Sequence, residues 1–278
     1  MKTRIIAGLV MAAIGIPVLL LSEYWVFPIV VSIMSAIAVW ELLGVTGFRK
    51  NIFVCLPAYA IAIALPPFCY KIPSLEAAFD LLVNMAAAAI LFMLYLIGYS
   101  VVKRGAVKLN DIALFYVYYV YITFAFTSVT LLRYIPNGAY SYMMIFIAAW
   151  ICDISAYFVG FAIGKHKLIP AVSPKKTWEG AIGGVFFTTV AFLIYGLVLT
   201  FIEGAPAPNF LVLALLGAVL SVISQFGDLS ASLLKREKGI KDFGKIFPGH
   251  GGVLDRFDSL LPVAPVLLMM CLLVSPFA

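Results

Sequence analysis

The chain has 278 residues and a net charge of +6; 64% of its residues are hydrophobic and only 12% are charged. Its mean hydropathy is +1.10. A soluble domain carries about 25% charged residues and cannot hide this much apolar surface from water. The composition therefore excludes soluble globular, disordered, collagen-like and nucleic-acid-binding proteins, and it indicates a polytopic membrane protein.

Nine apolar segments separated by polar breaks predict an all-α fold with nine transmembrane helices. Each segment is close to the ~20 residues that span about 30 Å of hydrocarbon. In chain order they are residues 5–21, 24–43, 52–70, 78–102, 111–132, 140–163, 180–202, 209–234 and 260–277. The first resembles a signal peptide, but it lacks a small-residue cleavage site and a second span follows at once, so we expect it to be retained.

The connections between the spans predict a single membrane domain over residues 1–278. We find no long linker and no internal repeat, and the longest connection, 235–259, is polar. Residues 1–135 are expected to form a scaffold, and residues 136–278 a catalytic half with two working loops, 164–179 and 235–259.

The basic residues indicate how the chain crosses the membrane. Seventeen of the 19 Lys and Arg fall on the side of the N-terminus, and only Lys71 and Arg133 fall on the other side. Because cytoplasmic loops carry an excess of Lys and Arg, we expect a cytoplasmic N-terminus, two cytoplasmic working loops and a C-terminus outside. Attraction to anionic lipids accounts for part of this charge.

Asp153 and Asp228 lie in the interior of predicted spans, where an ionisable group is costly and requires a partner. Asp228 shares a helix face with Ser221, Ser224, Gln225 and Ser232, and such a stripe predicts the wall of a wet cavity. The serines could instead form hydrogen bonds between helices.

Asp153 lies on one helix face with Gly160 and Gly164, a spacing that is common where membrane helices pack closely. A structural role and a functional role both stay open for it. Glu41 lies near the end of its span and could extend its side chain to the interface, so we assign it no function.

The first loop ends in the sequence Ser173-Pro174-Lys175-Lys176-Thr177 before the next helix. Hydroxyl and backbone N–H groups at a helix N-terminus, beside two lysines, can bind a phosphate group. A lysine pair at the membrane surface is an equally good explanation.

The second loop combines glycines with cations and carboxylates. Glycines at 249, 251 and 252 surround His250 and allow the backbone to approach a ligand closely. Lys and Arg side chains suit a polyphosphate, and aspartates supply the oxygen ligands that Mg²⁺ prefers. This pattern indicates metal-assisted phosphoryl or nucleotidyl transfer.

The residues from Ser232 to Asp258 resemble the signature of the phosphatidate cytidylyltransferase family. The pattern is Ser-x-Leu-Lys-Arg-x₄-Lys-Asp-x-Gly-x₂-Phe-Pro-x-His-Gly-Gly-Val-x-Asp-Arg-Phe-Asp. The resemblance implies the reaction of CTP with phosphatidate to give CDP-diacylglycerol and diphosphate at the cytoplasmic membrane. It also implies Mg²⁺, with K⁺ as a further candidate cation, and a homodimer.

The resemblance and the loop chemistry together predict the site residues. Catalytic roles are expected for Asp228, Asp255, Lys235, Arg236, His250 and Arg256. Substrate binding is expected for Ser173, Lys175, Lys176, Thr177, Lys241, Gly251 and Gly252. Metal ligands are expected at Asp228 and Asp255, with Asp153, Asp242 and Asp258 as further candidates.

Three other functions are alternatives to this one. A CTP-dependent polyprenol or dolichol kinase would transfer the γ-phosphate to an alcohol instead. An ion-coupled transporter could use Asp153 and Asp228 as relay carboxylates, but the chain lacks paired half-repeats interrupted by Gly or Pro. A CDP-alcohol phosphatidyltransferase is disfavoured because its DGx₂AR…Gx₃Dx₃D pattern is absent.

Overall fold

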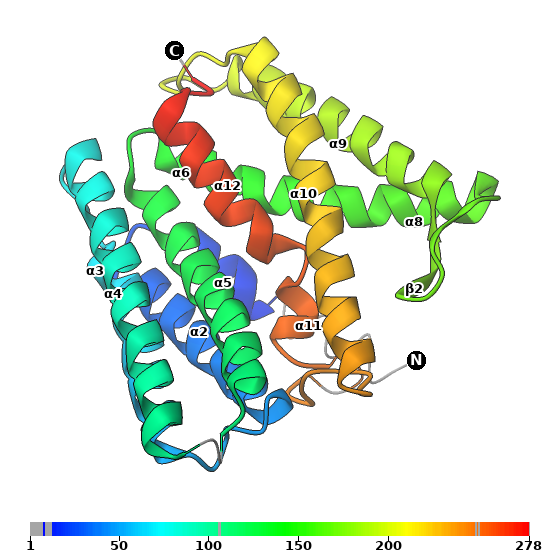
Figure 1. Ribbon diagram of the computed structural model, residues 1–278. Coiled ribbons are helices and arrows are strands. Elements are labelled where there is room, and N and C mark those ends of the chain that lie inside the picture. Colours follow the sequence, from blue (N-terminus) through cyan, green and yellow to red (C-terminus); the bar gives the residue numbers. More distant parts are fainter. Residues whose placement is uncertain (1–7, 9–12, 105–106, 248, 250, 278) are drawn as a thin grey trace. The chain divides into compact units, whose positions relative to one another are not determined.

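The structure is a computed structural model that describes residues 8, 13–104, 107–247, 249 and 251–277 (Figure 1). Six helices within these residues are long and apolar enough to cross a membrane. They are α2 (Val26–Val45), α4 (Leu75–Val102), α5 (Leu109–Tyr134), the run Gly138–Ile163, α9 (Trp178–Leu199) and α10 (Phe210–Glu237). Two shorter apolar helices are α3 (Ile52–Phe68) and α12 (Leu260–Leu273).

A mostly helical, multi-pass membrane fold therefore agrees with the sequence prediction, but the count of nine spans is not confirmed. The predicted segments from 24–43 onward each coincide with a helix, although α3 and α12 are shorter than a full span. Prolines explain part of this, since α3 contains Pro57, Pro66 and Pro67 and ends at the next residue. Seven residues of the first predicted span, 5–7 and 9–12, lie outside the described residues, and residues 13–20 of that span are helical.

The described residues fall into two compact units. The first contains residues up to Pro136 together with Phe243–Leu254, and the second contains Asn137–Asp242 and Asp255–Ala278. The glycine-rich loop is thus divided, because its central part packs with the N-terminal helices and Asp255 begins the last segment of the second unit.

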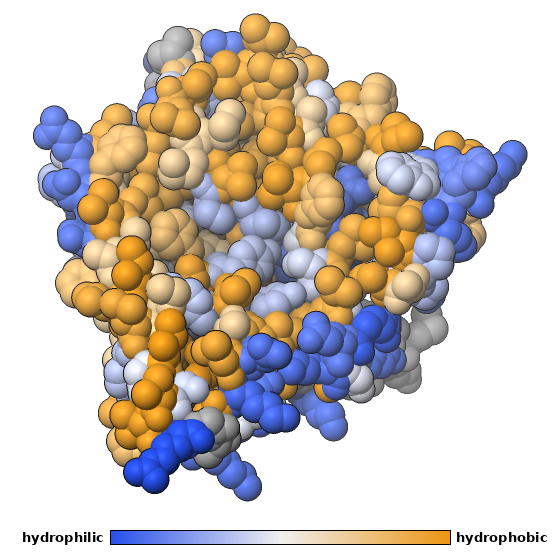
Figure 2. All heavy atoms as spheres, in the orientation of Figure 1, coloured by the Kyte–Doolittle hydropathy of each residue, from blue (hydrophilic) through white to orange (hydrophobic). Residues whose placement is uncertain are grey.

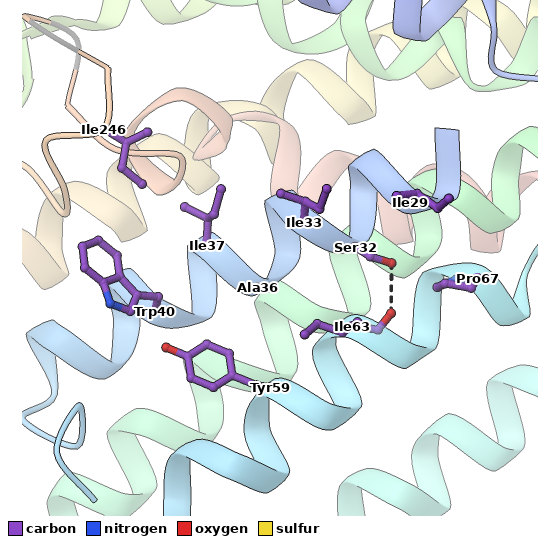
Figure 3. Close-up of a pocket in the computed structure, with 10 residues that line it drawn as sticks. All are labelled: Ile29, Ser32, Ile33, Ala36, Ile37, Trp40, Tyr59, Ile63, Pro67 and Ile246. Atoms are coloured by element: carbon purple, nitrogen blue, oxygen red, sulfur yellow. Dashed lines mark hydrogen bonds between the residues drawn. The ribbon is translucent and has the colours of Figure 1, made fainter. Parts of the chain in front are cut away.

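In the first unit, α2 packs against both α3 and α5. An apolar groove of about 650 Å³ runs along α2 and α3 (Figure 3). Trp40 and Tyr59 line it from the two helices, and Ile246 of the glycine-rich loop lines it as well. The guanidinium of Arg49 stacks on the Trp40 ring, 3.9 Å from its centroid.

In the second unit, α9 packs against α8 (Cys152–Ile163) on one side and α10 on the other. Glycine allows the close approach of α8 and α9, because a Cβ at Gly180 would lie 2.6 Å from the carbonyl oxygen of Ala156. Figure 2 shows apolar residues over most of the visible face, with hydrophilic residues at the end of α10 and around a short hairpin.

That hairpin is a departure from the all-α expectation. Strands β1 (Lys167–Ile169) and β2 (Ser173–Thr177) pair antiparallel within the predicted loop 164–179. Lys167 lies opposite Thr177, and Ile169 lies opposite Ser173. A two-stranded ribbon this short carries no clear alternation of apolar residues, so the hydrophobic pattern of the sequence does not predict it.

The run that leads to Asp153 is not a uniform α-helix. Two short helices, α6 (Gly138–Ser141) and α7 (Met143–Phe146), precede a π-helical turn, η1 (Ile147–Ile151), and α8 follows directly. Turns of this kind are rare and occur frequently at functional sites.

Candidate active site

Two lysine–aspartate ion pairs lie in the second unit. The Nζ of Lys176 is 2.6 Å from Oδ2 of Asp228, and the Nζ of Lys235 is 3.0 Å from Oδ1 of Asp255. The first pair is the more accessible, since 28% of the Asp228 side chain is exposed but only 2% of the Asp255 side chain. Four of the residues predicted to act on a phosphorylated substrate therefore form two ion pairs.

Strand β2 and helix α10 position the first pair. Side chains alternate along a strand, so Lys175 is exposed while the next residue, Lys176, turns toward Asp228 on α10. Thr177 ends the strand and caps α9, because its hydroxyl accepts a hydrogen bond from the N–H of Gly180 at 3.2 Å. The Ser232 hydroxyl donates to Asp228 at 3.4 Å from one turn along α10.

The second pair joins the end of α10 to the short helix α11 (Leu254–Phe257). Lys235 lies in the last turn of α10, and Asp255 lies in α11. The aspartate is almost fully buried, and the ammonium offsets its charge. The pair therefore fixes Asp255 against the end of α10.

Ser259 connects two further carboxylates. Its hydroxyl donates to Asp153 at 2.8 Å, and its N–H donates to Asp258 at 2.9 Å. Burial, chiefly, and the nearby carboxylates of Asp228 and Asp153 together raise the pKa of the Asp258 carboxyl to about 7. Negative charge is thus concentrated here, with Lys235 offsetting part of it.

The other predicted residues lie in different surroundings. Arg236 is exposed, and its Nε donates to the carbonyl oxygen of Val172 at 3.4 Å, so its contact is with the hairpin. Arg256, Lys241 and Asp242 are also exposed.

Two glycines and one histidine complete the predicted set. Gly251 has a φ of 86°, a conformation that favours glycine, and its carbonyl accepts from the N–H of Phe247 at 2.9 Å. Gly252 packs against a carboxylate of the first unit. His250 lies outside the described residues.

That carboxylate belongs to Glu41, to which the sequence alone assigns no function. Glu41 is fully buried and accepts hydrogen bonds from the N–H groups of Val253 and Leu254, each at 2.9 Å. The available signal was an acidic residue at the end of an apolar span, which must find donors. Nothing in the pattern indicated donors more than 200 positions along the chain.

The donor set is compatible with Mg²⁺ only if a substrate completes the coordination. Within the described part of the chain, no three His, Cys, Asp or Glu side chains come close enough to hold a metal ion by themselves. Mg²⁺ is commonly held by one or two carboxylates together with phosphate oxygens and water. Asp228 and Asp255 are the carboxylates that could contribute to such a site, together with the oxygens of a bound phosphate.

Apolar helices of membrane-spanning length, with lysine–aspartate pairs at a hairpin and a helix end, fit a membrane enzyme that acts on a phosphorylated substrate. The chain belongs to the cytidylyltransferase family, whose sequence profile matches residues 2–274.

Individual relatives match over almost their whole length. The chain is 34% identical to a phosphatidate cytidylyltransferase of Bacillus subtilis over 277 residues, which cover 99% of both chains. Proteins of the same name from Staphylococcus aureus and Pseudomonas aeruginosa are each 34% identical over 271 residues. Those matches cover 96% of this chain and 97% and 95% of the relatives.

Proposed function

We propose that this protein is a CTP:phosphatidate cytidylyltransferase, which converts CTP and phosphatidate into CDP-diacylglycerol and diphosphate. The observation that carries the proposal is the match over 99% of both chains to a relative of that name. The two Lys–Asp pairs support it, because the reaction brings two anions together and releases a third.

The reaction requires little acid–base chemistry from the protein. An oxygen of the phosphatidate phosphate is already a nucleophile, and it forms a bond to the α-phosphorus of CTP. The bond from that phosphorus to the bridging oxygen of the β-phosphate breaks, and diphosphate leaves with the electron pair. Catalysis therefore depends on alignment and on stabilising negative charge.

Each pair has a role in this proposal. Lys176 and Lys235 neutralise phosphate charge, and Asp228 and Asp255 are the residues that would hold Mg²⁺. A bound Mg²⁺ would add positive charge that stabilises the leaving diphosphate. The polyphosphate is contacted by Lys241, His250 and Arg256. The edge of the substrate site is formed by Ser173, Lys175 and Thr177.

The proposal includes the orientation of the site, a second cation and the oligomeric state. The active site faces the cytoplasm, because the basic residues gather on that side. A monovalent cation such as K⁺ shares the site, and the enzyme acts as a homodimer; both rest on the family resemblance of residues 232–258.

The decisive experiment uses purified protein in detergent with phosphatidate, Mg²⁺ and CTP labelled either in cytidine or at the γ-phosphate. We expect the cytidine label in the lipid phase and the γ label in diphosphate. Diacylglycerol, which lacks the nucleophilic phosphate, is the matched control and should take up neither label. Transfer of the γ label to lipid would establish a kinase instead, and no labelled lipid at all would refute the proposal.

A further inference from the structure

We propose that Glu41 is a positioning residue. It holds the glycine-rich loop so that the Asp255 side chain keeps the orientation in which it pairs with Lys235. Glu41 lies in the last part of α2 and is completely buried. One carboxylate oxygen accepts from the N–H of Val253 and the other from the N–H of Leu254, both at 2.9 Å. Asp255 is the next residue in the chain.

The two hydrogen bonds constrain orientation as well as position. Two successive peptide groups are held by the two oxygens of one planar carboxylate, so the chain cannot rotate about either bond without losing a contact. Hydrogen bonds to a charged acceptor are about twice as strong as those between neutral groups. The backbone that enters Asp255 is therefore fixed by a single side chain.

The loop is shaped around this carboxylate. A Cβ at Gly244 or at Gly252 would overlap Oε1 of Glu41. Neither glycine has a positive φ, so the backbone conformation itself would accept alanine. Glycine is needed at both positions because the loop passes directly over the carboxylate from two sides.

The free-energy cost of placing the Glu41 carboxylate inside a membrane helix indicates that this residue has a specific function. A carboxylate inside a membrane helix costs a few kcal/mol on insertion scales unless it is paired or hydrogen-bonded. An apolar residue would pack at this place in α2 without that cost. The geometry instead uses the charge to hold a loop whose next residue forms the Lys235–Asp255 ion pair.

The effect on Asp255 is argued on the basis of the proposed function, but the hold on the loop can be measured without any activity. Glu41→Gln keeps the size of the side chain, removes the charge and replaces one acceptor oxygen by an NH₂ group. Amide hydrogen exchange of residues 251–257 should become at least about tenfold faster, as expected when a charge-assisted hydrogen bond of 1.5–3 kcal/mol is lost. Ser35→Ala, a buried change on the same helix, should leave this exchange as it is in the wild type.

Kinetics provide the second readout. In Glu41→Gln we expect kcat to fall by about 10- to 100-fold, the range typical of a misplaced reacting group. The KM for CTP should change by less than about threefold, because the lysines that meet phosphate are untouched. A purely structural role would instead lower the thermal midpoint and the amount of active enzyme while leaving kcat per folded molecule unchanged.

A substitution on the loop side tests the same contact if Glu41→Gln fails to fold. Gly244→Ala should speed exchange at residues 251–257 and lower kcat, because its Cβ displaces the carboxylate. Gly98→Ala is the matched control, since a Cβ there has no atom within 4 Å.

Unchanged exchange at residues 251–257 in either folded variant would overturn the proposal. Faster exchange with unchanged kcat would overturn the link to Asp255 alone. If the wild-type protein shows no transfer of cytidine to lipid, the proposed function fails, while the exchange result still decides whether Glu41 holds the loop.

Discussion

Lys175 and Lys176 are neighbours in the chain, but only Lys176 meets a carboxylate. We expect Lys176→Met to lower kcat/KM by about 10- to 100-fold, which corresponds to the 1.5–3 kcal/mol of a contact with a charged group. Lys175 is exposed in β2, and Lys175→Met makes the same change of side chain. Its kcat/KM should therefore stay within about twofold of the wild type. Equal effects of the two substitutions on initial rates with CTP would show that Lys175 and Lys176 have the same role, whichever way their side chains face.

Asp228 offers an accessible carboxylate, whereas Asp255 is buried. Asp228→Asn should lower turnover by more than about 100-fold, since residues that only orient metal ligands already cost about 10- to 100-fold. Release of diphosphate measured against Mg²⁺ concentration tests this expectation. Asp242→Asn is the matched control and should be nearly silent, because Asp242 is exposed. Near-normal metal-dependent turnover in Asp228→Asn would make Asp228 a packing residue.

The sequence could identify these residues but not their partners. Asp228 was predicted from a polar stripe on a helix, which depends only on helical periodicity. The pairing of Lys235 with Asp255 joins positions 20 residues apart, and that of Lys176 with Asp228 depends on a hairpin. The pattern of residues within one element does not report contacts between elements. For the same reason it does not indicate the hydrogen bonds that Glu41 accepts from Val253 and Leu254.

At the scale of elements, the crossing of α8 and α9 depends on glycine. A Cβ at Gly180 would lie 2.6 Å from the carbonyl oxygen of Ala156 and 3.2 Å from the Cα of Gly160, so the backbones would have to separate. Such overpacking costs about 1–3 kcal/mol. Gly180→Ala should therefore lower the thermal midpoint of the protein in detergent by several degrees, at about 2–4 °C per kcal/mol.

The matched control for Gly180→Ala is again Gly98→Ala, which adds the same methyl group in open space. A loss of activity should accompany the loss of stability only for Gly180→Ala, because Gly180 bonds to the cap Thr177 that follows Lys176. Equal midpoints in the two variants would show that the helices tolerate a wider separation.

Helices were predictable and their interruptions were not. Composition alone indicated membrane-crossing helices, because ~20 apolar residues leave few other structures in a bilayer. The hairpin within 164–179 and the π-helical turn at Ile147–Ile151 depend on local hydrogen bonding that leaves no period in the sequence. The ends of α3 and α12 were likewise extended too far by counting apolar residues.

For the whole molecule, the proposed topology places the two ends of α10 on opposite sides of the membrane. Its 28 residues correspond to about 42 Å, more than the hydrocarbon thickness. Glu203 before the helix and Glu237 at its end are both exposed. In intact cells, a membrane-impermeant maleimide should label Glu203→Cys but should label Glu237→Cys only after permeabilisation.

The native cysteines should give little background in that experiment, since Cys55, Cys69 and Cys152 are buried and Cys271 is only partly accessible. The reverse labelling pattern would invert the proposed orientation. Labelling of both positions from outside would mean that α10 does not cross the membrane.

The π-helical turn at Ile147–Ile151 has a consequence for how Asp153 is aimed. A π turn accommodates one more residue than an α turn, and each residue of an α-helix advances the direction of the side chains by about 100°. Cys152 and Asp153 follow the turn at once, and Asp153 meets the Ser259 hydroxyl. Removing one residue from the turn would rotate that carboxylate about a quarter of a circle away from Ser259 without altering any functional side chain. The direction of the Asp153 side chain thus depends on the number of residues in the turn before it. A single-residue insertion or deletion here would turn its carboxylate toward another side of the helix.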